Sequence, residues 1–399
     1  MSGAAICAPA TLGRVVSAPA RAVRVLTLTP FYPHVENPAE GCFVAEVLPF
    51  TGELGIANEV VAVRPFYRGQ VPPLDSSIRC AWKSYLSLPG NLGLPLSGSL
   101  LAANLISYVR KTHQVETVDL IHAHGALPCG YAAAKLSEAL GIPFVVSVHG
   151  LDAYSERQAG PVLGIPCRNL SRRVYRLARA VVCVSEKVRE AIADDLVNTT
   201  VIYNGVNERL FSPGDEQTSP LLVLSVGNLI ATKGHAELLR AFAEVMSSVP
   251  DCELEIIGEG PERASLARLS AELGIANRVR FRGKQPREAV AQGVAHCAVF
   301  ALPSSYEGLG CVYLEAMSAA KPTIACEGQG IGEIIRHGTN GLLVPPRAQP
   351  ELSAALRMLL QNQEFRRRMG DAARATVLQF HTLEHQAKQL AQLYRECVR

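Results

Sequence analysis

Two glutamates, eight positions apart, flank a short glycine-containing segment and form the strongest chemical signal in the sequence. Glu307 and Glu315 lie in Leu302–Ala316, LPSSYEGLGCVYLEA, which reads as a strand end, a loop and a helix. Carboxylates accept strong charge-assisted hydrogen bonds, so they suit sugar or ribose hydroxyls. Glycines let backbone N–H groups approach an anion at the helix N-terminus. We therefore interpret the segment as a ligand site, although acidic residues near a helix start are also favoured by the dipole alone.

A lysine follows a second strand-like run, Val226–Gly234, VGNLIATKG. Lys233 falls in a short loop before a helix, where its ammonium group can neutralise a diphosphate leaving group. A solvated surface lysine explains this residue equally well when it is considered alone. The segment Glu255–Pro261 carries a weaker glycine signal, which a bare turn also explains.

Histidines end two other predicted strands. His149 closes the buried run in Val145–Asp152, VVSVHGLD, where it can contact a substrate hydroxyl or take part in proton transfer. His122 and His124 lie in the segment DLIHAH, and the sequence offers no third ligand that would make them a metal site. We interpret these two as structural or acceptor-side residues, and a structural role is also open for His149.

Two further features lie in the first half. The long segment Thr29–Val44 follows the first strand and contains Gly41, so it is either a loop over a phosphate or acceptor, or a plain surface loop. One helical region is rich in arginine: Arg168, Arg172, Arg173, Arg176 and Arg179. These side chains suit an anionic membrane or a lipid-phosphate acceptor, but a solvated helix face explains them slightly better.

Short apolar runs alternate with helical segments, which predicts parallel sheets covered on both faces. The expected strands of the first half are Val23–Leu28, Glu59–Val63, Asp119–His122, Phe144–Val148, Val181–Val184 and Val201–Tyr203. Those of the second half are Leu221–Val226, Leu254–Ile257, Val279–Phe281, Val299–Leu302, Thr323–Ala325 and Leu342–Val344. Expected helices include Gly130–Leu140, Leu170–Ala178, Ala236–Ser247 and Cys311–Ala319. The aperiodic stretch 211–220, FSPGDEQTSP, reads as the linker between two domains.

Bulk properties narrow the class of protein. The chain has 399 residues, with 48% hydrophobic and 19% charged residues, which favours two globular α/β domains. A net charge of +3 is too small to indicate a nucleic-acid partner. The eleven cysteines form no CxxC pair, so neither a zinc knuckle nor a thioredoxin-type site is indicated. Scattered free thiols suit the reducing cytoplasm better than secretion. Residues 1–20 lack the basic start of a signal peptide and are expected to be a disordered extension.

These residues together resemble family 4 of the retaining glycosyltransferases, which have the GT-B fold. Glu307 and Glu315 match the family's E-x7-E motif, and Lys233 matches its phosphate-binding lysine. His149 matches the histidine near the donor sugar ring, and Gly41 matches the N-terminal glycine motif. The resemblance runs from about residue 24 to the C-terminus. It implies two Rossmann-like domains facing a central cleft, with residues 21–210 on the acceptor side and 221–382 binding the donor.

The resemblance also implies roles for other residues. Backbone N–H groups of Gly308, Leu309 and Gly310 would meet the diphosphate, and the terminal helix at 383–399 would pack back on the first domain. Asn228 stands where the family usually has an arginine, so either Lys233 carries the diphosphate with less help or another basic residue substitutes. Glu40 precedes Gly41, and its carboxylate would repel a diphosphate unless it points away.

The expected function is transfer of a hexose, with retention, from a nucleotide-diphosphate sugar to a glycan, lipid-linked or small-molecule hydroxyl. No metal or other cofactor is expected, because the resemblance places catalysis on the departing diphosphate and the sequence has no DxD-type aspartate cluster. We expect a cytoplasmic protein that builds polysaccharide or glycoconjugate, with peripheral contact to an anionic membrane as an option. An epimerase of the same fold and a non-catalytic nucleotide-sugar-binding subunit are the alternatives.

Overall fold

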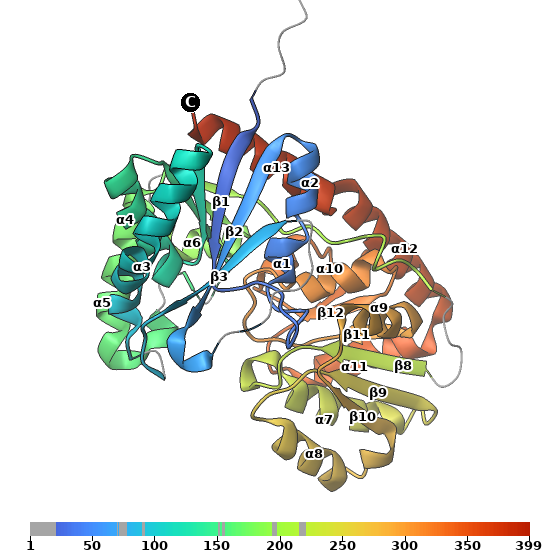
Figure 1. Ribbon diagram of the computed structural model, residues 1–399. Coiled ribbons are helices and arrows are strands. Elements are labelled where there is room, and N and C mark those ends of the chain that lie inside the picture. The colour runs from blue at the N-terminus through green and yellow to red at the C-terminus, as the bar shows by residue number, and fades with distance from the viewer. Residues whose placement is uncertain are drawn as a thin grey trace, which may run out of the picture.

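The structure is a computed structural model that describes residues 21–69, 71, 78–89, 92–150, 152–153, 156–193, 198–214 and 221–399, apart from the side chains of 156–162. The predicted extension at 1–20 and most of the predicted linker lie outside these residues. Two parallel sheets with covering helices confirm the predicted α/β architecture of GT-B type (Figure 1).

The first sheet has seven parallel strands in the order β3-β2-β1-β4-β5-β6-β7. Their bounds are β1 Val23–Thr29, β2 Ile56–Pro65, β3 Arg79–Tyr85, β4 Leu120–His124, β5 Phe144–Val148, β6 Ala180–Cys183 and β7 Thr199–Val201. The sequence predicted no strand in the region of β3. Only Tyr85 of β3 is fully buried, so this edge strand lacks the apolar run that marks the central ones. Strand β7 also lies at an edge and begins two residues before the predicted 201–203.

The second sheet has six parallel strands in the order β10-β9-β8-β11-β12-β13. Their bounds are β8 Leu221–Val226, β9 Cys252–Ile257, β10 Val279–Gly283, β11 Val299–Ala301, β12 Thr323–Cys326 and β13 Leu342–Val344. Each of these strands overlaps a predicted one. In both sheets the strand order reverses beside the first strand of the domain, and loops at such a switch point form the ligand crevice of parallel sheets.

Helices cover both faces of each sheet (Figure 1). Those of the first domain are α1 Cys42–Ala45, α2 Leu48–Glu53, η1 Phe66–Arg68, α3 Leu94–Val115, η3 Ala126–Gly130, α4 Tyr131–Leu140, α5 Glu156–Leu177 and α6 Glu186–Ala191. Those of the second domain are η5 Ala231–Lys233, α7 His235–Met246, α8 Arg263–Glu272, η6 Ala276–Arg278, α9 Arg287–His296, α10 Cys311–Ser318, η7 Gly330–Glu333, α11 Gln349–Gln361 and α12 Gln363–Phe380.

The last helix, α13 Leu383–Cys397, leaves the second domain and lies along the first (Figure 1). Its apolar face is buried in a cluster with residues of the first sheet, such as Val25 and Leu120. At its start, the backbone of Val206 and that of Thr382 form a parallel bridge. The two domains are therefore joined by the linker and again by the chain that leads into α13.

Candidate active site

A cleft of about 360 Å³ lies between the domains, at the carboxyl ends of strands from both sheets. All of the predicted site residues except Gly41 line this cleft: His149, Asn228, Lys233, Glu307, Gly308, Leu309, Gly310 and Glu315. The fold therefore gathers residues that are up to half the chain apart in sequence. Their chemical roles stay predictions at this point.

The loop that leads into α10 depends on glycine because backbone segments approach it closely. A Cβ on Gly308 would lie 2.0 Å from the carbonyl oxygen of His149, across the domain boundary. Gly310 has a φ of 88° and precedes the first residue of α10. The side chain of Leu309 is buried, so its backbone rather than its side chain is available to a ligand. The N-terminus of α10 thus opens into the cleft, where its free N–H groups favour an anion.

Lys233 and Glu307 form an ion pair inside the cleft. The Nζ atom of Lys233 lies 2.5 Å from Oε1 of Glu307, and the two side chains are 19% and 11% exposed. Lys233 ends the η5 turn after β8, and the backbone N–H of Glu307 donates to Oε1 of Gln329 at 2.9 Å. The lysine is therefore not the solvated surface residue that the sequence alone allowed. Its charge is held in the wall of the cleft.

The sequence reading did not identify Arg287, the second cation of the cleft. Arg287 begins α9, bonds Glu315 through Nη1, and bonds both carboxylate oxygens of Glu46 in the first domain at 3.0 Å. Its guanidinium also lies over the ring of Phe211, 4.7 Å from the centroid. Burial alone would lower the pKa of Arg287, but Glu315, Cys42 and Glu46 outweigh it and raise the pKa.

The ion pair between Glu46 and Arg287 crosses from one domain to the other. Burial raises the pKa of Glu46, and Arg287 opposes this shift only in part. A second crossing involves Glu333, whose carboxylate accepts the backbone N–H groups of Glu186 and Lys187 at 2.8 Å each. The start of α6 is thereby held by an acid of the other domain. These charged contacts span the cleft and hold the domains against each other.

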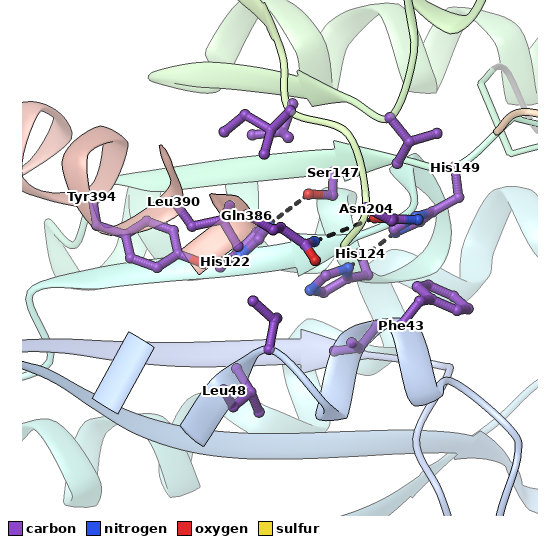
Figure 2. Close-up of a pocket in the computed structure, with 15 residues that line it drawn as sticks. Phe43, Leu48, His122, His124, Ser147, His149, Asn204, Gln386, Leu390 and Tyr394 are labelled. Atoms are coloured by element: carbon purple, nitrogen blue, oxygen red, sulfur yellow. Dashed lines mark hydrogen bonds between the residues drawn. The ribbon is translucent and has the colours of Figure 1, made fainter. Parts of the chain in front are cut away.

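His149 belongs to a buried group of histidines (Figure 2). Its Nε2 lies 3.0 Å from Nδ1 of His124, and the two rings are stacked with centroids 5.2 Å apart. His122 lies between Ser147 and the hydroxyl of Tyr394 in α13, at 2.7 Å from each. Figure 2 shows this row of polar side chains running from Tyr394 towards His149.

All three rings are neutral near pH 7 because burial lowers their pKa values. The pKa of His122 falls to about 3, that of His124 lies well below its usual value, and that of His149 is also lowered. Within the described residues, Nδ1 of His149 has no hydrogen-bond partner. His149 therefore presents one free ring nitrogen while its other nitrogen is fixed by His124, which suits contact with a substrate hydroxyl.

Gly41 does not line the cleft, but it shapes the loop that does. Its φ is 67°, and a Cβ there would lie 2.3 Å from the carbonyl carbon of Phe31. This close approach places Cys42 and Phe43 in the cleft wall. The preceding Glu40 turns elsewhere, because its carboxylate lies 3.1 Å from Nε2 of His34 and accepts a bond from Asn37. The predicted repulsion between Glu40 and a diphosphate in the cleft therefore does not arise.

The loop after β8 carries Asn228 at the position where an arginine was expected. Asn228 lines the cleft, and the neighbouring Gly227 packs against Gly258 so closely that a Cβ on Gly258 would lie 1.9 Å from the Gly227 carbonyl oxygen. Close packing against Gly227 therefore requires glycine at position 258. The sequence alone had suggested no more than a turn at this segment. Arg287 supplies a cation in the same cleft from α9, which is the kind of substitution the sequence left open.

Comparison with known proteins decides the family. Residues 55–210 match the family described as Glycosyltransferase Family 4, and residues 206–376 match Glycosyl transferases group 1. An uncharacterized glycosyltransferase of Methanocaldococcus jannaschii is 30% identical over 275 residues, which cover 67% of this chain and 74% of the relative. The chain belongs to the family 4 glycosyltransferases. The predicted family is thereby confirmed.

Solved structures show the same fold as this glycosyltransferase. Sucrose-phosphate synthase from Thermosynechococcus elongatus superimposes with a TM-score of 0.76 at 22% identity, covering 94% of this chain and 98% of that one. HepE from Anabaena, in complex with UDP and glucose, gives a TM-score of 0.73 at 20% identity, covering 94% and 99%. The helices of the described residues include none that is long and apolar enough to cross a membrane.

Proposed function

We propose that the protein transfers a hexosyl group from a nucleoside-diphosphate sugar to an acceptor hydroxyl, with retention at the anomeric carbon. The observation that carries this proposal is the convergence of Lys233, Glu307, Glu315 and the N-terminus of α10 on one interdomain cleft. The complex of HepE with UDP and glucose supports a donor of this class. The family match alone would leave open whether the site is intact, and these residues argue that it is.

Each group has a role in this proposal. Glu315 accepts hydrogen bonds from the ribose hydroxyls, while Glu307 and His149 contact the sugar. Lys233 and the backbone N–H groups at 308–310 stabilise the diphosphate as its negative charge grows. The acceptor oxygen forms a bond to the anomeric carbon on the face that the diphosphate leaves. The carbon–oxygen bond to the diphosphate breaks, and the acceptor proton passes to a departing phosphate oxygen.

We propose further that catalysis needs no metal ion, because the chain's own groups offset the diphosphate charge. Among the described residues, no group of three His, Cys, Asp or Glu side chains is arranged so that it could hold a metal ion, and this includes the packed histidines. Turnover should then be unchanged in excess EDTA. A loss of activity that Mg²⁺ or Mn²⁺ restores would refute this part of the proposal and leave the donor site in place.

Location and membrane contact are part of the same proposal. The ten described cysteines are free, as suits a cytoplasmic enzyme of polysaccharide or glycoconjugate synthesis. Arg173, Arg176 and Arg179 are exposed and suit peripheral contact with an anionic membrane. Co-sedimentation with phosphatidylglycerol vesicles, but not with phosphatidylcholine vesicles, tests this contact. Equal recovery in the supernatant with both would contradict it.

The experiment that tests the donor site is thermal-shift screening against UDP-, GDP-, ADP- and TDP-sugars. A ligand that binds only the native state raises its stability, by about 2.7 kcal/mol at a hundredfold excess over Kd. Stabilisation by one base supports the proposal and identifies the donor class. No shift with any of the four would contradict it and favour a module that has lost its nucleotide-sugar ligand. Product analysis without acceptor separates transfer from epimerisation, because only an epimerase converts the donor alone.

A further inference from the structure

A second large cavity, of about 350 Å³, lies within the first domain at the carboxyl ends of β1, β2 and β3. It adjoins the donor cleft. Asp152 lines the cavity, and its Oδ1 accepts the backbone N–H of His149 at 2.8 Å, while the ring of His149 lines the cleft. The ring of Phe31, which also lines the cavity, contacts that of His149 at a centroid distance of 6.1 Å.

One end of this cavity carries hydrogen-bond donors that lack acceptors. Arg64 is the last residue but one of β2, and Trp82 lies on the neighbouring strand β3. Within the described part of the chain, Nη1 of Arg64 and Nε1 of Trp82 are buried and have no hydrogen-bond partner. Both atoms can only donate. Leaving such a group unsatisfied costs about 1–3 kcal/mol, so two of them in one wall favour a ligand that brings acceptors.

The charge of Arg64 is likewise unmatched. No ion pair of Arg64 occurs among the described residues, although two acids line the same cavity. Glu40 is engaged by His34 and Asn37, and Asp152 faces the His149 backbone. A half-buried guanidinium without a carboxylate partner binds anions such as carboxylate and phosphate well, because its donors form a fixed fork that two of their oxygens can accept.

Asp152, which also lines the cavity, has the reverse chemistry. It follows β5, which lies on the other side of β1 from β2 and β3 in the sheet, and so marks a different end of the cavity from Arg64 and Trp82. Within the described residues, Oδ2 of Asp152 is buried without a hydrogen-bond partner. An ionised carboxylate can only accept, so this oxygen suits the hydroxyl of a ligand. Because Asp152 adjoins His149, the hydroxyl end of such a ligand would be the end nearest the donor sugar.

We propose that this cavity binds the acceptor and that the acceptor carries an anionic group, a carboxylate or a phosphate, held by Arg64 and Trp82. Its reacting hydroxyl lies at the Asp152 end. This inference rests on the proposed transferase function and names the substrate class of its acceptor side. The bonds formed and broken are those of the transfer itself, and Asp152 orients the hydroxyl without taking its proton.

The test compares three probes on the full chain by saturation-transfer NMR titration: D-glucose, D-glucuronate and D-glucose 6-phosphate. The wild type should bind at least one charged probe about tenfold more tightly than glucose, the factor expected when about 1.4 kcal/mol comes from a charge-assisted contact. Arg64→Gln should remove this preference. Arg110→Gln, which changes an exposed arginine of α3, is the matched control and should keep it. The relative affinity of the two charged probes distinguishes a carboxylate from a phosphate acceptor.

Trp82→Phe keeps a ring and removes one N–H, so it should weaken the charged probe about two- to fivefold and leave glucose unchanged. The proposal is overturned if the wild type binds glucose as tightly as both charged probes, if it binds none of the three, or if Arg64→Gln retains the preference. Calorimetry with the nucleotide identified by thermal shift separates the two proposals. Unchanged nucleotide affinity in Arg64→Gln keeps the donor site intact whichever way the acceptor test falls.

Discussion

Replacing Lys233 by alanine is the sharpest test of the donor site, because the lysine is held in place by one identifiable partner. Its Nζ lies 2.5 Å from Glu307, and both side chains are largely buried. The substitution removes the positive charge and leaves Glu307 with its backbone bond to Gln329 and no cation. We expect turnover to fall strongly while the fold persists, since Lys233 ends a three-residue turn outside the hydrophobic core.

The size of the loss follows from the exchange of partners. A hydrogen bond to a charged group contributes about 1.5–3 kcal/mol, and about 1.4 kcal/mol changes a rate tenfold. In the free protein Lys233 already binds Glu307. The contribution of Lys233 to catalysis is therefore the difference between its interaction free energy with the departing diphosphate and that with Glu307. The diphosphate gains charge in the transition state, which keeps the difference favourable. We therefore expect kcat/KM to fall about 10- to 100-fold.

The assay is steady-state release of the nucleoside diphosphate with the donor found by thermal shift. Lys284→Ala serves as the matched control, because Lys284 is an exposed lysine of the same domain. Lys233→Arg keeps the charge and should recover part of the lost rate. Thermal unfolding of each variant checks the fold. Turnover of Lys233→Ala within about twofold of the wild type would refute the assigned role.

Three further predictions concern the rest of the site. Glu315→Ala should weaken donor binding about tenfold in calorimetry, and unchanged affinity would exclude the ribose contact. Glu46→Gln should weaken the interdomain ion pair with Arg287. The KM for the donor and the radius of gyration in small-angle scattering should therefore rise. Values identical to those of the wild type would show that the ion pair does not hold the cleft closed. Because the pKa of His122 is lowered to about 3, the unfolded chain takes up this proton first as pH falls. The stabilisation that the neutral His122 provides is complete above about pH 6.5 and lost towards pH 3. His122 alone should therefore contribute a decline of roughly 1.4 kcal/mol per pH unit to the free energy of unfolding below pH 6, and His122→Asn should make the total decline in urea unfolding shallower by about that amount.

The sequence predicted the central strands well, because each is a short apolar run buried on both faces. β5 and β12 are buried at every position. It failed at the edge, where β3 carries arginine, lysine and serine and needs no apolar run to pair with β2. Edge strands form by backbone pairing on one side, so hydrophobic periodicity carries little information about them.

The candidate site was predictable where the residues follow strands in a fixed local order. Glu307, Glu315 and Lys233 were identified in this way. Arg287 and Glu46 were not, because they are 241 positions apart and nothing in either segment marks the pairing. A residue whose role comes from a partner in the other domain becomes visible only when the domains are placed together. The turn of Glu40 towards His34 was also not predicted, although the two residues are only six positions apart in one loop.

The ion pairs in the cleft affect how the cleft would bind a doubly charged diphosphate. The arginine expected at position 228 is absent, so other cations would have to balance this charge. The two cations of the cleft, Lys233 and Arg287, are matched by three carboxylates, those of Glu46, Glu307 and Glu315. A diphosphate alone would therefore meet cations that are already paired. A nucleotide sugar also brings ribose and sugar hydroxyls, which can satisfy Glu315 and Glu307. This exchange would release Lys233 and the Nη1 of Arg287 towards the phosphates, while Glu46 keeps its two bonds to Arg287. On this argument, asparagine instead of arginine at position 228 lowers the affinity of the cleft for a free diphosphate. It thereby increases the preference of the cleft for the complete nucleotide sugar over the diphosphate alone.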